Sequence, residues 1–145
     1  MSGGRGLSDE EGQGGEERTG LVFVDPDEKS RGQVEGLEAG LGRPILAVDP
    51  SEFNPAESEE IGRAAAFVVC WDLGFRCGAD LLEELRASET FGDRKILVSM
   101  DAPTRSLVRT AMALGADGVC RRPYDEAEIL ACLERLGLPR LETAA

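Results

Sequence analysis

The stretch Ala64-Ala65-Ala66-Phe67-Val68-Val69-Cys70-Trp71-Asp72 decides the fold. It is a continuous apolar run that ends abruptly at polar residues, a pattern typical of a strand buried on both faces at the centre of a parallel sheet. A short loop follows, and the segment from Gly78 to Arg86 then has the apolar spacing of an amphipathic helix. Because ligands bind at the carboxyl ends of the strands in such sheets, we expect the functional residues near Cys70 and Asp72.

Four further apolar runs repeat this pattern along the chain. Each is short and ends at polar or turn-forming residues, as buried strands do. Segments with helical spacing separate the runs, and this alternation predicts an α/β fold with a doubly wound, five-stranded parallel sheet and right-handed crossovers. The four runs are Leu21–Val24, Ile45–Val48, Ile96–Met100 and Gly118–Arg121.

Two of the connecting segments are expected to form poor helices. Gly32, Gly36 and Gly40 interrupt the segment after the first strand, and each glycine costs about 1 kcal/mol relative to alanine inside a helix. Pro55 lies within residues 51–63, where it removes a backbone donor and obstructs the preceding turn. We therefore expect a short or broken helix between the second and third strands.

The charge of the chain excludes some classes of function. Its 145 residues include 16 Lys and Arg against 28 Asp and Glu, for a formal net charge of −12. The phosphate backbone of a nucleic acid would be repelled by such a protein, and the sequence contains neither a membrane span nor a targeting signal. We expect a cytoplasmic protein that binds neither nucleic acid nor membrane.

The length fits a single domain with a short segment at each end. Residues 1–20 are rich in Gly, Ser, Glu and Asp without apolar periodicity, which predicts a disordered acidic tail. Residues 21–138 form the predicted domain, and residues 139–145 form a short C-terminal tail.

The chain has no histidine and four scattered cysteines, Cys70, Cys77, Cys120 and Cys132. None of them forms a CxxC pair, so we expect no metal site of the zinc type. The missing histidine removes the commonest general base, and we expect no catalytic residue and no enzymatic activity.

Several motifs follow one another in a recognisable order. The motifs are Val24-Asp25-Pro26-Asp27, Cys70-Trp71 at eight residues before Gly78, Val98-Ser99, Ala113-Leu114-Gly115-Ala116-Asp117-Gly118, and Arg122-Pro123-Tyr124. Over residues 21–138 the chain resembles the receiver domain of bacterial two-component response regulators, and the run 114–124 is the most specific part. The resemblance implies a flavodoxin-like (βα)5 receiver fold and a cis peptide bond before Pro123.

The resemblance also implies a chemistry. In receiver domains a phosphoryl group passes from a histidine of a kinase to an aspartate at the end of the third strand. A Mg²⁺ ion held by acidic residues after the first strand neutralises the phosphoryl oxygens. A Ser or Thr after the fourth strand and a Lys before a proline then bind the phosphate.

This chain departs from that pattern at three positions. Cys70 stands at the acceptor position, Pro26 replaces one acidic residue, and Arg122 replaces the lysine, whereas Ser99 is the residue type that the family uses. Mg²⁺ loses two oxygen ligands by these changes, and an arginine fork does not reproduce the point contact of a lysine. The degenerate acceptor pocket therefore consists of Cys70, Asp25, Asp27, Asp72, Ser99 and Arg122.

A second alignment makes Asp72 the phosphate acceptor, with Mg²⁺ as its cofactor. It requires a following loop two residues shorter than usual, and it changes the position of Trp71 in the strand. The alternative reading of Asp72 is a solvated loop carboxylate.

Cys70 and Arg122 each allow two interpretations. Cys70 is either a small buried thiol or, with Arg122 close by, a low-pKa redox sensor. Cys77 is the nearest candidate disulfide partner, although we favour a free thiol. Arg122 either holds an anion near Ser99 or pairs with Asp25 or Asp27, and we favour the ion pair.

Together these departures predict a pseudo-receiver that is not switched by phosphorylation. Such a domain would act in signal transduction as a protein-protein interaction module. The resemblance implies a histidine kinase, an output protein or another receiver as its partner. No cofactor is expected, and Mg²⁺ would be needed only if Asp72 were an acceptor.

Overall fold

The computed structural model of the chain describes residues 18–141. Residues 1–17 of the predicted N-terminal tail and residues 142–145 lie outside the described residues. The first strand begins at Gly20, one residue before the predicted start of the domain.

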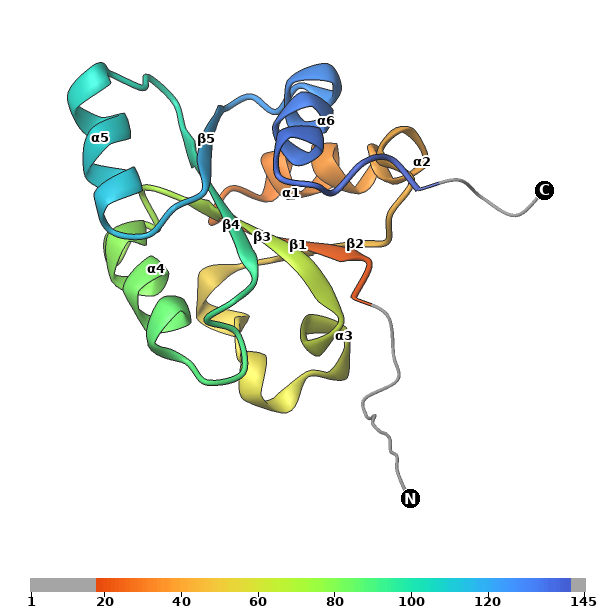
Figure 1. The fold of residues 1–145 in the computed structure, drawn as a ribbon, viewed down its shortest axis with the longest axis horizontal. Helices are drawn as coiled ribbons and strands as arrows, with labels where there is room; N and C mark the ends of the chain where they lie inside the picture. Colours follow the sequence, from red (N-terminus) through yellow and green to blue (C-terminus); the bar gives the residue numbers. More distant parts are fainter. Residues whose placement is uncertain (1–17, 142–145) are drawn as a thin grey trace.

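Five parallel strands form a single sheet in the order β2-β1-β3-β4-β5, as the sequence predicts (Figure 1). β3 is buried along its whole length between β1 and β4. The strands are β1 (Gly20–Val24), β2 (Ile45–Val48), β3 (Ala64–Cys70), β4 (Lys95–Met100) and β5 (Gly118–Arg121). This order places the carboxyl ends of β1, β3 and β4 side by side at one edge of the sheet.

Helices cover both faces of the sheet (Figure 1). One face carries α1 (Glu28–Glu35), α2 (Glu38–Leu41) and α6 (Glu126–Arg135), and the other carries α3 (Glu59–Gly62), α4 (Gly78–Ala87) and α5 (Arg105–Ala113). Each layer buries its own apolar cluster against the sheet, centred on Phe23 on the first face and on Phe67 on the second.

The longer helices begin at side chains that accept a hydrogen bond from the first turn. Asp27 caps α1 and Asp125 caps α6. Thr104 caps α5, and Asp101, three residues earlier, has another partner.

Both segments expected to be poor helices are interrupted. The segment after β1 divides at Gly36 into α1 and α2. Between β2 and β3 there are two short 3₁₀ turns, η2 (Pro50–Glu52) and η3 (Pro55–Glu57), followed by the single turn of α3. The crossover between these strands therefore covers little of the sheet.

Part of the predicted C-terminal tail lies against the fold. Arg43 donates to the carbonyl of Pro139 at 2.7 Å, and Arg140 donates to the carbonyls of Gly40 and Ala39 at 2.9 and 3.1 Å. Among residues 18–141, no helix is both long and apolar enough to cross a membrane.

Candidate functional site

Asp25 is the centre of a polar cluster at the carboxyl edge of the sheet. It follows β1 and is fully buried. Its Oδ1 accepts from the backbone N–H of Asp27 at 2.9 Å and from Arg122 Nη2 at 3.0 Å. Its Oδ2 accepts from Arg122 Nε at 2.9 Å and from the Tyr124 hydroxyl at 2.8 Å. Both carboxylate oxygens are therefore saturated by donors of the protein itself.

Arg122 supplies the positive charge of this cluster. It follows β5, where its N–H donates to the carbonyl of Met100 at 2.9 Å, and the peptide bond to Pro123 is cis, as expected. Besides the two-pronged contact with Asp25, its Nη1 donates to Asp101 at 2.6 Å and its Nη2 to Ser30 Oγ at 3.2 Å. Burial lowers the pKa of Arg122, but the hydrogen bonds to Asp25 and the surrounding negative charges outweigh this and raise it. The guanidinium is permanently charged.

Tyr124 closes the buried side of the cluster. Its ring lies edge-on to Phe23, with centroids 5.3 Å apart, and this packing directs the hydroxyl towards the sheet edge. The hydroxyl donates to Asp25 and shares a second hydrogen bond of 2.9 Å with Ser99 Oγ. Burial, followed by the charge of Asp25, raises the pKa of Tyr124.

Cys70 lies at the end of β3, directly opposite Ser99 on β4. It is buried, and its Sγ donates to the carbonyl of Asp72 at 3.2 Å. Burial and the charge of Asp25 raise the pKa of Cys70, although Arg122 acts in the opposite direction. A thiol in such surroundings stays protonated at neutral pH, which argues against an activated sulfur.

The turn after β3 is held close to the strand end. The N–H of Gly78 donates to the carbonyl of Trp71 at 2.6 Å. A Cβ at Gly78 would collide with the carbonyl of Cys70, so the glycine at this spacing is required by the close approach of the helix to the strand. All four cysteines are free, and Cys77 caps α4 instead of pairing with Cys70.

Asp27 and Asp72, the other two carboxylates of the predicted pocket, lie exposed on its rim. Asp27 caps α1 by accepting from the N–H and the hydroxyl of Ser30, at 2.9 and 2.7 Å. Those bonds lower the pKa of Asp27. Asp72 accepts from the N–H of Gly74 at 2.9 Å, within its own loop. Arg122 thus pairs with Asp25 and not with Asp27.

The residues present do not fit the Mg²⁺ ion that the resemblance implies. A hard cation needs several free oxygen ligands at close range, whereas both oxygens of Asp25 are already bound by N–H and O–H donors. The guanidinium of Arg122 lies against Asp25, where a cation would have to bind. Within residues 18–141, no three His, Cys, Asp or Glu side chains are grouped so that they could hold a metal ion.

Comparison with known proteins identifies the fold of this chain but no sequence family. No family model and no curated protein sequence matches this chain. Solved structures do match it, over about four fifths of its length. The chain has the fold of response-regulator receiver domains.

Three of these structures illustrate the likeness. A putative response regulator from Chloroflexus aurantiacus has a TM-score of 0.70 and 15% identity, over 83% of this chain and 98% of that one. The chemotaxis response regulator CheY4 of Vibrio cholerae has a TM-score of 0.69 and 15% identity, over 81% and 98%. A response regulator from Burkholderia pseudomallei, with a phosphorylated aspartic acid and a calcium ion, has a TM-score of 0.62 and 20% identity, over 79% and 66%.

Three members of the cluster were not predicted from the sequence as site residues. They are Tyr124, Asp101 and Ser30. The sequence did hold a signal for Tyr124. Packing after the proline requires only an aromatic ring, so the hydroxyl points to a further role. Asp101 and Ser30 carry no comparable signal, since their contacts depend on where the Arg122 side chain ends.

Proposed function

We propose that this chain is a receiver-like interaction module of signal transduction that works without being phosphorylated. In this proposal Cys70 occupies the acceptor position, and the chain has no catalytic activity of its own. Its partner is a histidine kinase, an output protein or another receiver, as the receiver fold suggests.

The observation that carries the proposal is the internal neutralisation of Asp25. Arg122 and Tyr124 bind both oxygens of this buried carboxylate, so the groups that would hold metal and phosphate in a receiver domain hold each other instead. A buried, bidentate arginine-carboxylate pair is rigid and costly to separate. The surface around the pocket is then presented in one fixed conformation.

The neutral thiol at Cys70 supports the same conclusion. Phosphoryl transfer to a receiver domain needs an ionised oxygen nucleophile and a divalent cation. Cys70 offers sulfur in place of oxygen, and burial and the charge of Asp25 keep its proton in place.

One observation favours phosphorylation at Asp72 as a second candidate function. A small cavity of ≈ 170 Å³ is bordered by Asp72 together with Cys70, Ser99, Asp101 and Arg122. An exposed carboxylate beside a serine and an arginine has access to an incoming phosphoryl group. Within residues 18–141 no three His, Cys, Asp or Glu side chains are grouped to hold a metal ion, which argues against this candidate, since Arg122 would have to replace Mg²⁺ alone.

Treatment with a small phosphodonor tests both candidates. The protein is incubated with acetyl phosphate and Mg²⁺ and its intact mass is measured, while Mg²⁺ and beryllium fluoride titrations are followed by the fluorescence of Trp71, next to Cys70. We expect no mass increase and no quenching under conditions that modify a phosphorylatable receiver domain run in parallel. A stoichiometric phosphoryl adduct that Asp72→Asn abolishes would overturn the proposal and establish the second candidate.

A further inference from the structure

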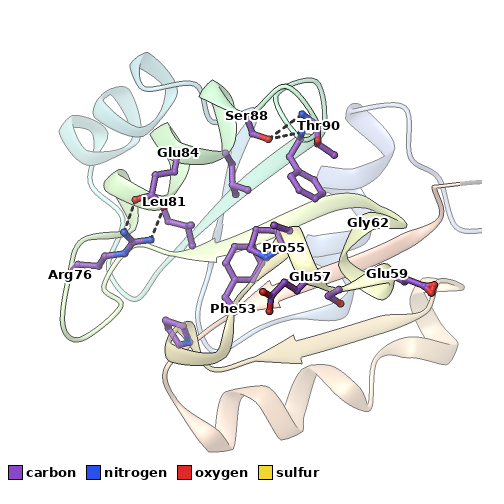
Figure 2. A pocket seen from close by; sticks show the side chains of 15 residues that line it. Phe53, Pro55, Glu57, Glu59, Gly62, Arg76, Leu81, Glu84, Ser88 and Thr90 are labelled. Carbon is purple, nitrogen blue, oxygen red and sulfur yellow. Dashed lines mark hydrogen bonds and ion pairs between the residues drawn. The ribbon is translucent and has the colours of Figure 1, made fainter. Parts of the chain in front are cut away.

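A cavity of ≈ 720 Å³ lies between residues 50–62 and helix α4, on the face of the sheet opposite α1 and α6 (Figure 2). Its floor is apolar and includes Phe53, Leu81, Leu85 and Phe91. The site around Asp25 contributes no residue to it. The cavity is therefore a separate feature of the surface.

The floor of this cavity is held in place by an aromatic row. Phe53 and Phe91 each pack edge-on against Phe67, with ring centroids 6.0 and 5.7 Å apart. Phe67 is fully buried in β3. Ser88 Oγ accepts from the N–H groups of Thr90 and Phe91, both at 3.1 Å, which fixes the loop that carries Phe91. A floor supported in this way is preformed, and its residues do not need to rearrange before a ligand binds.

The cavity exists because the crossover between β2 and β3 contains little helix. A right-handed crossover ordinarily covers the sheet with a helix of several turns. Here α3 has only four residues, preceded by the turns η2 and η3. Gly62, the last residue of α3, lines the cavity, and a Cβ placed on it would meet no atom within 4 Å, so the cavity is open at this end.

The rim of the cavity is acidic. Glu57 and Glu59 of the crossover and Glu84 of α4 line it. The single cation of the lining, Arg76, is bound by Glu84 of α4 at 2.8 and 3.3 Å (Figure 2). An occupant must therefore combine apolar side chains with positive charge, and the net charge of −12 attracts such a partner from a distance.

We propose that this groove, defined as the cavity between residues 50–62 and α4, binds an amphipathic basic helix of a partner protein. Its apolar face lies on Phe53, Leu81 and Leu85, and its Lys or Arg residues meet the acidic rim. The partner helix completes the helical layer that the β2–β3 crossover leaves open. A second copy of the chain or its own residues 1–17 would bring further negative charge to the rim, so they are disfavoured.

This inference rests on the proposed function in one respect only, namely that the chain is a binding module. Its test uses a labelled model peptide of about 18 residues, long enough to be helical once docked, with Leu at helical spacing on one face and Lys elsewhere. Two control peptides replace either all Lys by Glu or all Leu by Ser. We expect only the Leu/Lys peptide to bind saturably, with amide chemical-shift changes of the full chain confined to residues 50–62 and 76–91.

Two glycines provide a matched pair of variants. Gly62→Phe fills the groove, whereas Gly32→Phe places the same side chain on α1, where a Cβ also meets nothing within 4 Å. We expect Gly62→Phe to weaken binding at least about tenfold, because excluding one leucine side chain costs that much. Gly32→Phe should bind like the wild type. Reversal of the rim charge by Glu57→Lys should also weaken binding, and Glu134→Lys on α6 should not.

Other outcomes would overturn the inference. Shifts spread over the acidic surface, or equal binding of the Leu→Ser peptide, would show charge attraction without a groove. If deletion of residues 1–17, or dilution, shifted the groove resonances, the occupant would be the tail or a second copy. Phosphorylation at Asp72 would refute the proposed function, but it would leave groove binding unchanged.

Discussion

Replacing Arg122 by methionine tests the central ion pair most directly. The change keeps an unbranched side chain of similar length and removes the charge, leaving Asp25 without a cation. Asp25 is 0% exposed and Arg122 is 13% exposed, so the pair is largely desolvated. Breaking such a pair by removing one partner costs about 3–5 kcal/mol. Two donors to Asp25 remain, from Tyr124 and the Asp27 N–H, which places the expected loss near the lower value.

The loss is expected to be about 3 kcal/mol in the free energy of unfolding, or roughly 10 °C in melting temperature for a domain of this size. Asp101 adds little, because its side chain is 74% exposed and exposed ion pairs are weak. Urea unfolding monitored by far-UV circular dichroism measures this value, with Arg109→Met on the exposed face of α5 as the control. That control should stay within about 0.5 kcal/mol of the wild type.

The double variant Asp25→Asn/Arg122→Met separates the ion pair from the loss of packing. It removes the unpaired buried charge, so it should recover at least about 1 kcal/mol relative to Arg122→Met alone. An Arg122→Met variant as stable as the Arg109→Met control, or a double variant less stable than Arg122→Met, would refute the reasoning. Either result would mean that Asp25 is hydrated and does not depend on Arg122.

Three further predictions concern Tyr124, the cysteines and the three positions that depart from the receiver pattern. Tyr124 is the only tyrosine, and its pKa is raised by burial and by Asp25. Absorbance at 295 nm should therefore show no tyrosinate near pH 10, where free tyrosine is half ionised. The stability that Tyr124 contributes should be fully present below pH 10 and should be lost as the pH rises further above it. A tyrosinate midpoint near 10 in folded protein would contradict this. At pH 8 a thiol reagent should modify exposed Cys77 quickly and buried Cys70 only upon unfolding, whereas a second fast thiol lost in Cys70→Ser would support a redox sensor. Finally, Pro26→Asp/Cys70→Asp/Arg122→Lys should gain Mg²⁺-dependent tryptophan quenching, and Cys70→Asp alone should not, because Arg122 still covers Asp25.

The strands could be predicted from the sequence because burial on both faces requires a run of consecutive apolar residues. Runs such as Ala64–Cys70 are apolar throughout, and Asp27 and Asp125 indicate helix starts by residue type alone. The breaks at Gly36 and around Pro55 were predictable for the same reason, since propensity acts locally. What local pattern could not show is the cavity left by the second break, because its width depends on where α4 packs.

The polar cluster was predictable only in part. Arg122 and Asp25 are 97 residues apart in sequence, and the alignment of motifs brought them together. The role of Tyr124 depends on the edge-on contact with Phe23 that turns its hydroxyl towards Ser99. Likewise, the contact of Pro139 with Arg43 involves a backbone carbonyl, and sequence patterns carry no information on which carbonyl a distant arginine will reach.

A charge balance connects the substitutions at the site. In the buried part, Arg122 contributes one positive charge and Asp25 one negative charge, and protonated Cys70 contributes none. A carboxylate at position 70 would add a second buried anion against one guanidinium, and an added cation would then be needed to offset it. Conversely, the single ammonium group of a lysine at position 122 could not bind both oxygens of Asp25 in one plane, as the forked guanidinium does. The cysteine and the arginine therefore depend on each other. With both present the buried part of the pocket is neutral without a metal ion, as the proposed phosphorylation-independent role requires.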